Sequence, residues 1–106
     1  MTDVLVVFIT TPLADAPRIA KAIVEQRLAA CVNIVPGIRS IYRWQGKIED
    51  EPEALLVAKT ARDRFDALRD GVKQLHPYTV PEIIALPVVA GSPEYLAWVS
   101  AEVKAE

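Results

Sequence analysis

The sequence predicts a single α+β domain over residues 1–106, in the order β-α-β-β-α-β with one more helix at the end. Two observations favour this class. Short apolar runs typical of strands alternate with segments whose apolar residues recur at helical spacing. Pro and Gly residues stand between many of these segments, where turns are expected. A chain of 106 residues suits one domain and leaves little room for a second.

The first strand is predicted at residues 4–9, a continuous apolar run that suits a central strand buried on both faces. After a loop, Asp15 is expected to cap a helix that tolerates Pro17 in its first turn. The apolar residues of this helix recur at helical spacing. They are Ile19, Ile23, Val24 and Leu28.

A long hairpin is predicted next. Residues 31–35 read as a strand, which the Pro-Gly pair at 36–37 breaks or bulges before it continues. The extended segment 38–49 would reach about 40 Å, since a strand rises about 3.3 Å per residue. An acidic turn is expected at residues 49–52, after which the chain returns as a strand within residues 53–60.

This hairpin must overhang its own domain, because a lone domain of this size has a radius of gyration of only about 13 Å. The overhanging part carries Tyr42, Trp44 and Ile48. Exposed aromatic strands are an aggregation hazard unless another chain covers them. We therefore expect an obligate oligomer with these three residues at its interface.

The second half of the chain begins with another helical segment. Asp63 can cap a second helix, and His76 followed by Pro ends it. Its apolar stripe consists of Phe65, Leu68, Val72 and Leu75. A fourth strand is predicted at residues 83–89, where Pro87 implies an edge position or a bulge.

A last short helix opens at Ser92 and Pro93 and carries Tyr95, Trp98 and Val99 on one side. The complete order is that of the ferredoxin-like, split β-α-β arrangement, a four-stranded antiparallel sheet with two helices on one face. This architecture hosts many unrelated activities, so it predicts little about function.

Composition excludes several classes of protein. The net charge of −2 and the absence of a Lys/Arg run argue against nucleic-acid binding. No apolar run approaches the roughly 20 residues that span a bilayer, and the N-terminus lacks a signal-peptide pattern. A single cysteine, Cys31, excludes an intramolecular disulfide. We expect a cytoplasmic protein without a membrane partner.

Catalytic and cofactor signatures are missing, since no phosphate-binding glycine motif, zinc-ligand set or nucleophile elbow occurs. His76 is either a metal ligand or proton carrier, or a histidine that satisfies the end of its helix. Cys31 is either a small buried hydrophobe or a ligand for a soft metal such as Cu(I). Lys59 and Glu82 are either solvated strand ends or an ion pair in a cleft.

The aromatic residues Tyr42, Trp44, Tyr78 and Trp98 are expected to fill interfaces and the core rather than to bind a cofactor. The acidic residues 49–53 either attract divalent cations weakly or form a solvated hairpin tip that discourages edge-to-edge pairing.

Several segments together resemble the CutA divalent-cation tolerance proteins from about residue 4 to residue 99. The segments are Leu28-Ala29-Ala30-Cys31-Val32-Asn33, Pro36-Gly37, Ser40-Ile41-Tyr42-Arg43-Trp44-Gln45-Gly46-Lys47-Ile48, Lys59-Thr60, His76-Pro77-Tyr78-Thr79-Val80-Pro81-Glu82-Ile83 and Tyr95-Leu96-Ala97-Trp98. The resemblance implies a ferredoxin-like homotrimer, similar in architecture to the PII signalling proteins, whose long hairpin extends along a neighbour.

The resemblance also implies a role in tolerance to divalent metals, with copper binding in some members. His76 matches the family's His-Pro-Tyr motif and is the candidate metal ligand. Copper-binding members can present a cysteine near the end of the first strand and a second histidine before the motif. This chain has Ile9, Thr10 and Leu75 in those regions, which argues against a soft copper site built from those ligands.

Three functions follow as hypotheses. The first is a trimer that binds divalent metal ions, such as copper, weakly at clefts between subunits. The second is a PII-like small-molecule sensor or assembly scaffold without a metal role, in which Lys59, Tyr78, Glu82 and Trp98 line the cleft. An enzyme is the weakest case because the sequence gives no reaction class, and we expect no catalytic activity.

Overall fold

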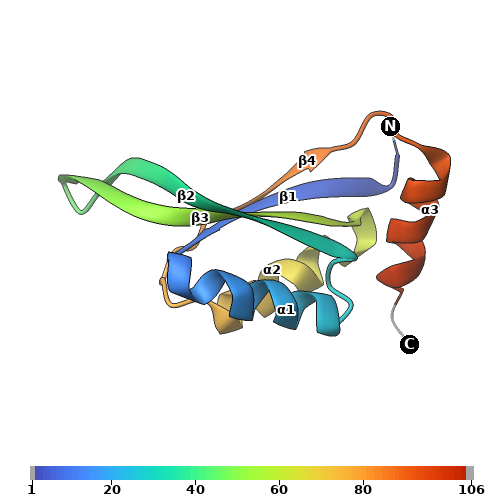
Figure 1. Cartoon of the computed structure of the whole chain (residues 1–106), viewed down its shortest axis with the longest axis horizontal. Coiled ribbons are helices and arrows are strands. Elements are labelled where there is room, and N and C mark those ends of the chain that lie inside the picture. Colours follow the sequence, from blue (N-terminus) through green and yellow to red (C-terminus); the bar gives the residue numbers. More distant parts are fainter. Residues whose placement is uncertain (1, 105–106) are drawn as a thin grey trace.

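A computed structural model describes residues 2–104, which form a four-stranded antiparallel sheet with two helices on one face and a third helix at one end (Figure 1). The elements are β1 Val4–Thr11, α1 Ala16–Glu25, β2 Cys31–Trp44, β3 Lys47–Ala61, α2 Phe65–Leu75, β4 Ile83–Pro87 and α3 Pro93–Glu102. The strand order is β2-β3-β1-β4, which confirms the predicted ferredoxin-like arrangement.

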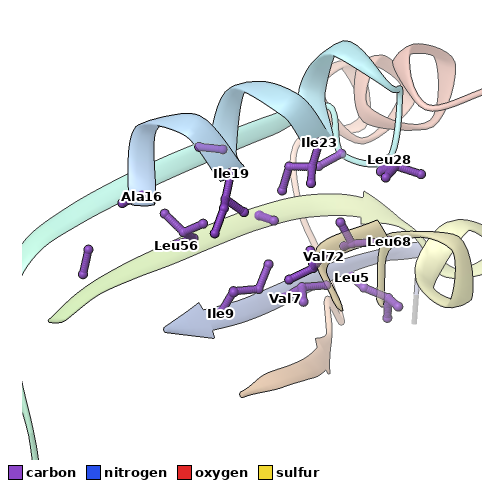
Figure 2. Packing of buried hydrophobic residues seen from close by; sticks show 14 residues of the cluster. Leu5, Val7, Ile9, Ala16, Ile19, Ile23, Leu28, Leu56, Leu68 and Val72 are labelled. Carbon is purple, nitrogen blue, oxygen red and sulfur yellow. The ribbon is translucent and has the colours of Figure 1, made fainter. Parts of the chain in front are cut away.

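The core lies between the sheet and helices α1 and α2. Alternate residues of the central strands point into it, among them Val7, Ile9 and Leu56, and all three are fully buried (Figure 2). Ile19 and Ile23 meet them from α1, as the helical spacing predicts. Val24 was expected in the same stripe, but its side chain is 40% exposed, so that prediction is wrong.

Helices α1 and α2 both lie on one side of the sheet and leave the other face uncovered by either of them (Figure 1). The register pairs Phe8 with both Val57 and Ile84, and Val6 with Leu86, so these five apolar residues share this face. We call them the open face. Its two β4 residues, Ile84 and Leu86, are 52% and 43% exposed. A half-covered apolar sheet face is unusual in a chain that works alone.

The hairpin of β2 and β3 projects well beyond the body of the domain, as predicted (Figure 1). The longest dimension of the molecule is 44 Å. The pairing register shifts between Val35 and Ile38, which confirms the predicted bulge at the Pro-Gly pair.

The turn of the hairpin is two residues long and lies at Gln45 and Gly46, whose φ values of 50° and 79° are both positive. Such a pair is typical of the tight turns that match the twist of antiparallel strands. The predicted acidic turn at residues 49–52 is therefore wrong, because these residues lie inside β3. The sequence Gln-Gly lacks the Asn or Asp that usually marks this turn.

Helix starts differ from the expected side-chain caps. Asp15 occupies the cap position of α1, but among residues 2–104 it makes no capping bond; its carboxylate accepts a hydrogen bond from Arg18 at 2.9 Å instead. Asp63 lies within a 3-10 turn, Arg62–Arg64, that precedes α2. In both places the 3-10 turn continues into the helix and takes over the role predicted for the cap.

The C-terminal elements are shorter or less buried than predicted. β4 ends at Pro87, on an edge of the sheet as expected, and does not continue to residue 89. Of the three residues predicted on one side of α3, only Val99 reaches the interior, whereas Tyr95 and Trp98 are 41% and 43% exposed. No helix within residues 2–104 is long and apolar enough to cross a membrane.

Candidate functional site

A groove of about 770 Å³ lies between the hairpin and the segment 77–82 that leads from α2 to β4. Four glutamates line it, together with three aromatic side chains. They are Glu49, Glu51, Glu53 and Glu82, with Tyr42, Trp44 and Tyr78. No lysine or arginine is among the described residues that line this groove, so its charge is strongly negative.

Strand alternation explains why these residues meet. The register places Ser40 opposite Glu51 and Tyr42 opposite Glu49. Side chains of alternate residues point to the same face of a strand, so Glu53 follows Glu51 on that face. The acidic residues of the hairpin and its aromatic residues therefore form one surface, which the segment 77–82 borders.

Glu53 and Tyr78 are joined by a hydrogen bond in the groove. The Glu53 side chain is only 4% exposed, and the Tyr78 hydroxyl donates a hydrogen bond to its Oε2 at 3.0 Å. Burial raises the pKa of the Tyr78 phenol, and the neighbouring Glu53 carboxylate raises it further. The phenol therefore stays protonated and serves as a donor to a carboxylate that is nearly removed from water.

The same carboxylates act on Tyr42. Loss of water around its phenol raises the Tyr42 pKa, and the negative charges of Glu51, Glu53 and Glu49 add to the shift. Negative charge accumulates in this groove because four glutamates line it without a basic side chain among the described lining residues. A cation would relieve this repulsion.

His76 ends α2, as predicted, but it satisfies a different carbonyl from the one expected. The residue is 7% exposed, and its Nε2 lies 2.7 Å from the backbone oxygen of Thr10 on β1. Nδ1 accepts the backbone N–H of Tyr78 at 3.1 Å. These partners require a neutral ring with the proton on Nε2. Metal coordination by His76 would require one of these bonds to break.

No group of three or more His, Cys, Asp or Glu within residues 2–104 lies close enough to hold a metal ion. Glu49 and Glu51 are separated along a strand, where residues two apart lie about 7 Å from each other. One chain therefore offers single carboxylates along the groove rather than a closed metal site.

Of the four residues expected to line a cleft between subunits, two lie at the groove of the single chain. Tyr78 and Glu82 line the groove, whereas Lys59 and Trp98 do not. Lys59 pairs with Val6 on β1, while Glu82 precedes the residue that pairs with Ile9, near the other end of that strand. Of the two alternatives for Lys59 and Glu82, an ion pair between them within one chain is therefore not formed.

Lys59 has another partner. Its Nζ donates a hydrogen bond to Oδ1 of Asn33 on β2, and its Cα register partner on that strand is Cys31. The Cys31 thiol is free and half-buried. Burial, with a smaller contribution from the nearby thiol, raises the pKa of the Tyr95 phenol. These residues form a small polar group that does not border the groove.

The fold and the groove together define a ferredoxin-like α+β protein with an acidic, aromatic-lined groove at the base of an overhanging hairpin. The chain belongs to the CutA1 divalent ion tolerance protein family, whose sequence model matches residues 5–102. The resemblance carried by the His-Pro-Tyr and Tyr-x-Trp segments is thereby confirmed.

Individual relatives agree. A divalent-cation tolerance protein CutA from Thermus thermophilus is 60% identical over 94 residues, covering 88% of this chain and 91% of the relative. The crystal structure of CutA from Xylella fastidiosa superposes with a TM-score of 0.94 at 45% identity, covering 97% of this chain and 100% of the other. A protein from Nostoc, described as a PII-like CutA in apo form, matches with a TM-score of 0.90 at 32% identity, covering 94% and 97%.

Plant and animal relatives are longer. The chain spans about half the length of the rice chloroplastic relative and of the human relative, 54% and 52% respectively. The similarity to these proteins therefore concerns the ferredoxin-like domain alone.

Proposed function

We propose that this chain acts in divalent-cation tolerance as a homotrimer that binds divalent metal ions, copper among them, weakly in clefts between subunits. The observation that carries the proposal is the groove with four glutamates and no basic side chain among its described lining residues. The low-dielectric walls of the groove concentrate the electric field of its carboxylates, and this field attracts a divalent cation.

Weak binding follows from the ligand geometry. Residues 2–104 of one chain offer isolated carboxylates and no closed group of ligands. Ligands from a second subunit would therefore be needed to complete a coordination shell. At sites of nitrogen and oxygen ligands, Cu²⁺ generally binds more tightly than Zn²⁺ or Mn²⁺. We therefore expect that order of affinity, with the glutamates rather than His76 as the first ligands.

Two exposed apolar surfaces support the trimer. Tyr42, Trp44 and Ile48 on the hairpin are 37%, 42% and 62% exposed in the single chain. The open face supplies the second surface on the body of the domain. A neighbouring subunit that covers both would remove them from water, which is the main favourable contribution to permanent association.

The proposal assigns the chain a binding role rather than a catalytic one. It also includes a cytoplasmic location. The free thiol of Cys31 is consistent with a reducing compartment. One relative is described as periplasmic, from Archaeoglobus fulgidus, and one as chloroplastic, from rice. Fractionation of cells that produce this chain tests the cytoplasmic location.

Calorimetric titration with Cu²⁺, Zn²⁺ and Mn²⁺, with the subunit mass determined by sedimentation in the same samples, tests the metal proposal. We expect saturable binding at a fixed ratio per trimer, in that order of affinity. Glu51→Gln should weaken binding by about tenfold, the loss of one charged ligand. Glu25→Gln is the matched control, because Glu25 is exposed at the end of α1 and does not line the groove.

Metal binding that equals the buffer blank, or equal weakening by both substitutions, would overturn this proposal. His76→Gln separates the two candidate ligand types. Unchanged affinity in this variant supports the glutamates as ligands, whereas abolished binding in a folded trimer would assign the site to His76 instead.

One observation favours the second hypothesis, a PII-like small-molecule sensor. The groove volume of about 770 Å³ is far larger than a metal ion requires, and it falls within the range of about 300–1,000 Å³ typical of small-molecule sites. A thermal-shift screen of metabolites tests it, since a ligand of the native state raises the apparent stability. A shift with an organic ligand in metal-free buffer, lost in Tyr78→Ala, would favour the sensor.

A further inference from the structure

A second cavity, of about 610 Å³, lies at the end of the molecule opposite the hairpin tip, where the end of β3 approaches α3 (Figure 1). Its polar lining residues come from three separate parts of the chain. They are Asp3, Arg62, Asp63, Arg64, Ser100 and Lys104. Because these residues are scattered over a hundred positions, no local motif in the sequence marks the cavity.

The charges in this cavity are not neutralised by one another. Three cations and two carboxylates line it, yet no ion pair within 4.0 Å joins any of these five side chains to a partner among residues 2–104. The surface ion pairs elsewhere, such as Arg39 with Asp50, show that this chain forms such contacts where the geometry allows. The three cations remain available to a ligand.

Arg64 lines this cavity with a guanidinium that a backbone contact holds in place. Its Nη2 donates a hydrogen bond to the backbone oxygen of Arg27 at 3.2 Å, which holds the guanidinium in place. Its Nε is buried and has no hydrogen-bond partner among the described residues. Because Nε is closed to solvent, a ligand in the cavity would meet the remaining N–H groups of the guanidinium.

The backbone adds to the same field. The 3-10 turn Arg62–Arg64 leads directly into α2, so the positive end of the helix dipole lies beside these side chains. The backbone N–H of Arg62 is already used, since it donates to the oxygen of Asp3 at 2.7 Å. The helix end therefore contributes mainly through its dipole, and the side chains supply the donors.

We propose that this cavity binds the phosphate group of a small phosphomonoester. Arg64 offers a guanidinium that its bond to the Arg27 backbone holds in place, and Arg62 and Lys104 bring two further positive charges, a combination suited to a doubly charged phosphate. The volume leaves room for the organic part of the ligand. Asp3 and Asp63 accept hydrogen bonds from hydroxyl groups on that part, which favours an ester over inorganic phosphate.

Calorimetric titration of the full chain with glucose 6-phosphate, inorganic phosphate and glucose, all with a metal chelator present, tests this proposal. We expect one saturable site per chain for the ester, at least about tenfold weaker binding of inorganic phosphate, and no binding of glucose. The chelator keeps the result independent of metal binding in the groove at the other end.

Substitutions locate the site. Arg62→Gln and Lys104→Gln change exposed side chains and should leave the fold intact, and each should weaken binding of the ester by about tenfold. Arg18→Gln and Lys21→Gln are the matched controls, since both residues are exposed on α1 outside the cavity. Equal weakening by the controls would show a general charge effect and overturn the proposal.

Arg64→Lys distinguishes a specific donor from a simple charge. The substitution retains the positive charge but removes Nε–H and the planar fork. We expect the ester to bind at least about tenfold more weakly to this variant, with secondary structure unchanged by circular dichroism. Wild-type affinity in Arg64→Lys, or no saturable binding of the ester to the wild type, would refute the assignment.

Discussion

The hydrogen bond between Tyr78 and Glu53 allows one energetic prediction to be worked through in detail. Glu53 is 4% exposed, and the Tyr78 hydroxyl is the only hydrogen-bond donor to its carboxylate among residues 2–104. A hydrogen bond to a charged group contributes about 1.5–3 kcal/mol, and an unsatisfied buried polar group costs about 1–3 kcal/mol. We therefore expect Tyr78→Phe to lower the free energy of unfolding by about 2 kcal/mol at neutral pH.

A double-mutant cycle isolates this pair. Glu53→Gln retains the shape of the side chain and removes the charge, and the double variant with Tyr78→Phe measures the coupling. Residues that share a hydrogen bond typically couple by about 0.5–3 kcal/mol. We expect about 1–2 kcal/mol here, from urea unfolding followed by fluorescence and circular dichroism. Every variant must be compared at one protein concentration, because assembly makes apparent stability depend on concentration.

Tyr42→Phe is the matched control. Tyr42 lines the same groove and is 37% exposed, against 36% for Tyr78, but its hydroxyl has no hydrogen-bond partner among the described residues. Its substitution should change stability by less than about 0.5 kcal/mol. A coupling energy below about 0.3 kcal/mol between Glu53 and Tyr78, or an equal effect in the control, would refute the reasoning.

Three further predictions follow. The folded-state pKa of Tyr78 lies above its unfolded value near 10. The protonated phenol therefore contributes its full stabilisation of the fold below pH 10, and this contribution is lost as the pH rises above 10. The alkaline loss of stability, measured by urea unfolding at several pH values, should be smaller in Tyr78→Phe. Ile23→Ala should destabilise by about 2–5 kcal/mol, and the neighbouring Val24→Ala by less than about 1 kcal/mol, because only Ile23 is fully buried; similar values in thermal unfolding would contradict the assigned helix face. Trp44→Asp should reduce the assembled mass in sedimentation more than His76→Ala does. Trp44 lies on the overhanging hairpin, whereas His76 is buried inside its own subunit. Equal loss of assembly in the two variants would count against the hairpin as an interface.

Most of the fold could be predicted because apolar periodicity and strand length act locally. The order of the elements, the bulge before Ile38 and the end of α2 at His76 all follow from neighbouring residues. The position of the hairpin turn could not be read in the same way. Residues 49–52 carry charges and a proline that favour a turn, but strand pairing over the whole hairpin outweighs that preference and moves the turn to Gln45 and Gly46.

The site was harder to predict because it depends on pairing register. The acidic run is visible in the sequence. That its side chains share a face with Tyr42 follows only from the strand register, which the turn at Gln45 and Gly46 sets. The contact of Glu53 with Tyr78 joins positions 25 apart, and only the return of the chain from α2 to β4 brings them together. Strand ends of a ferredoxin-like sheet can approach one edge, but the register separates Lys59 and Glu82 along β1.

The overhanging hairpin has a consequence for local stability. Beyond the bulge its strands pair with each other and leave Ile41 and Ile48 66% and 62% exposed, so in a single chain their amides are protected only by the two-stranded ladder. Isolated hairpins open easily, whereas core strands such as β1 open only with the whole domain. Hydrogen exchange at residues 39–52 therefore reports contact with another molecule separately from folding. Slow exchange at these amides identifies chains whose hairpin is bound to another molecule.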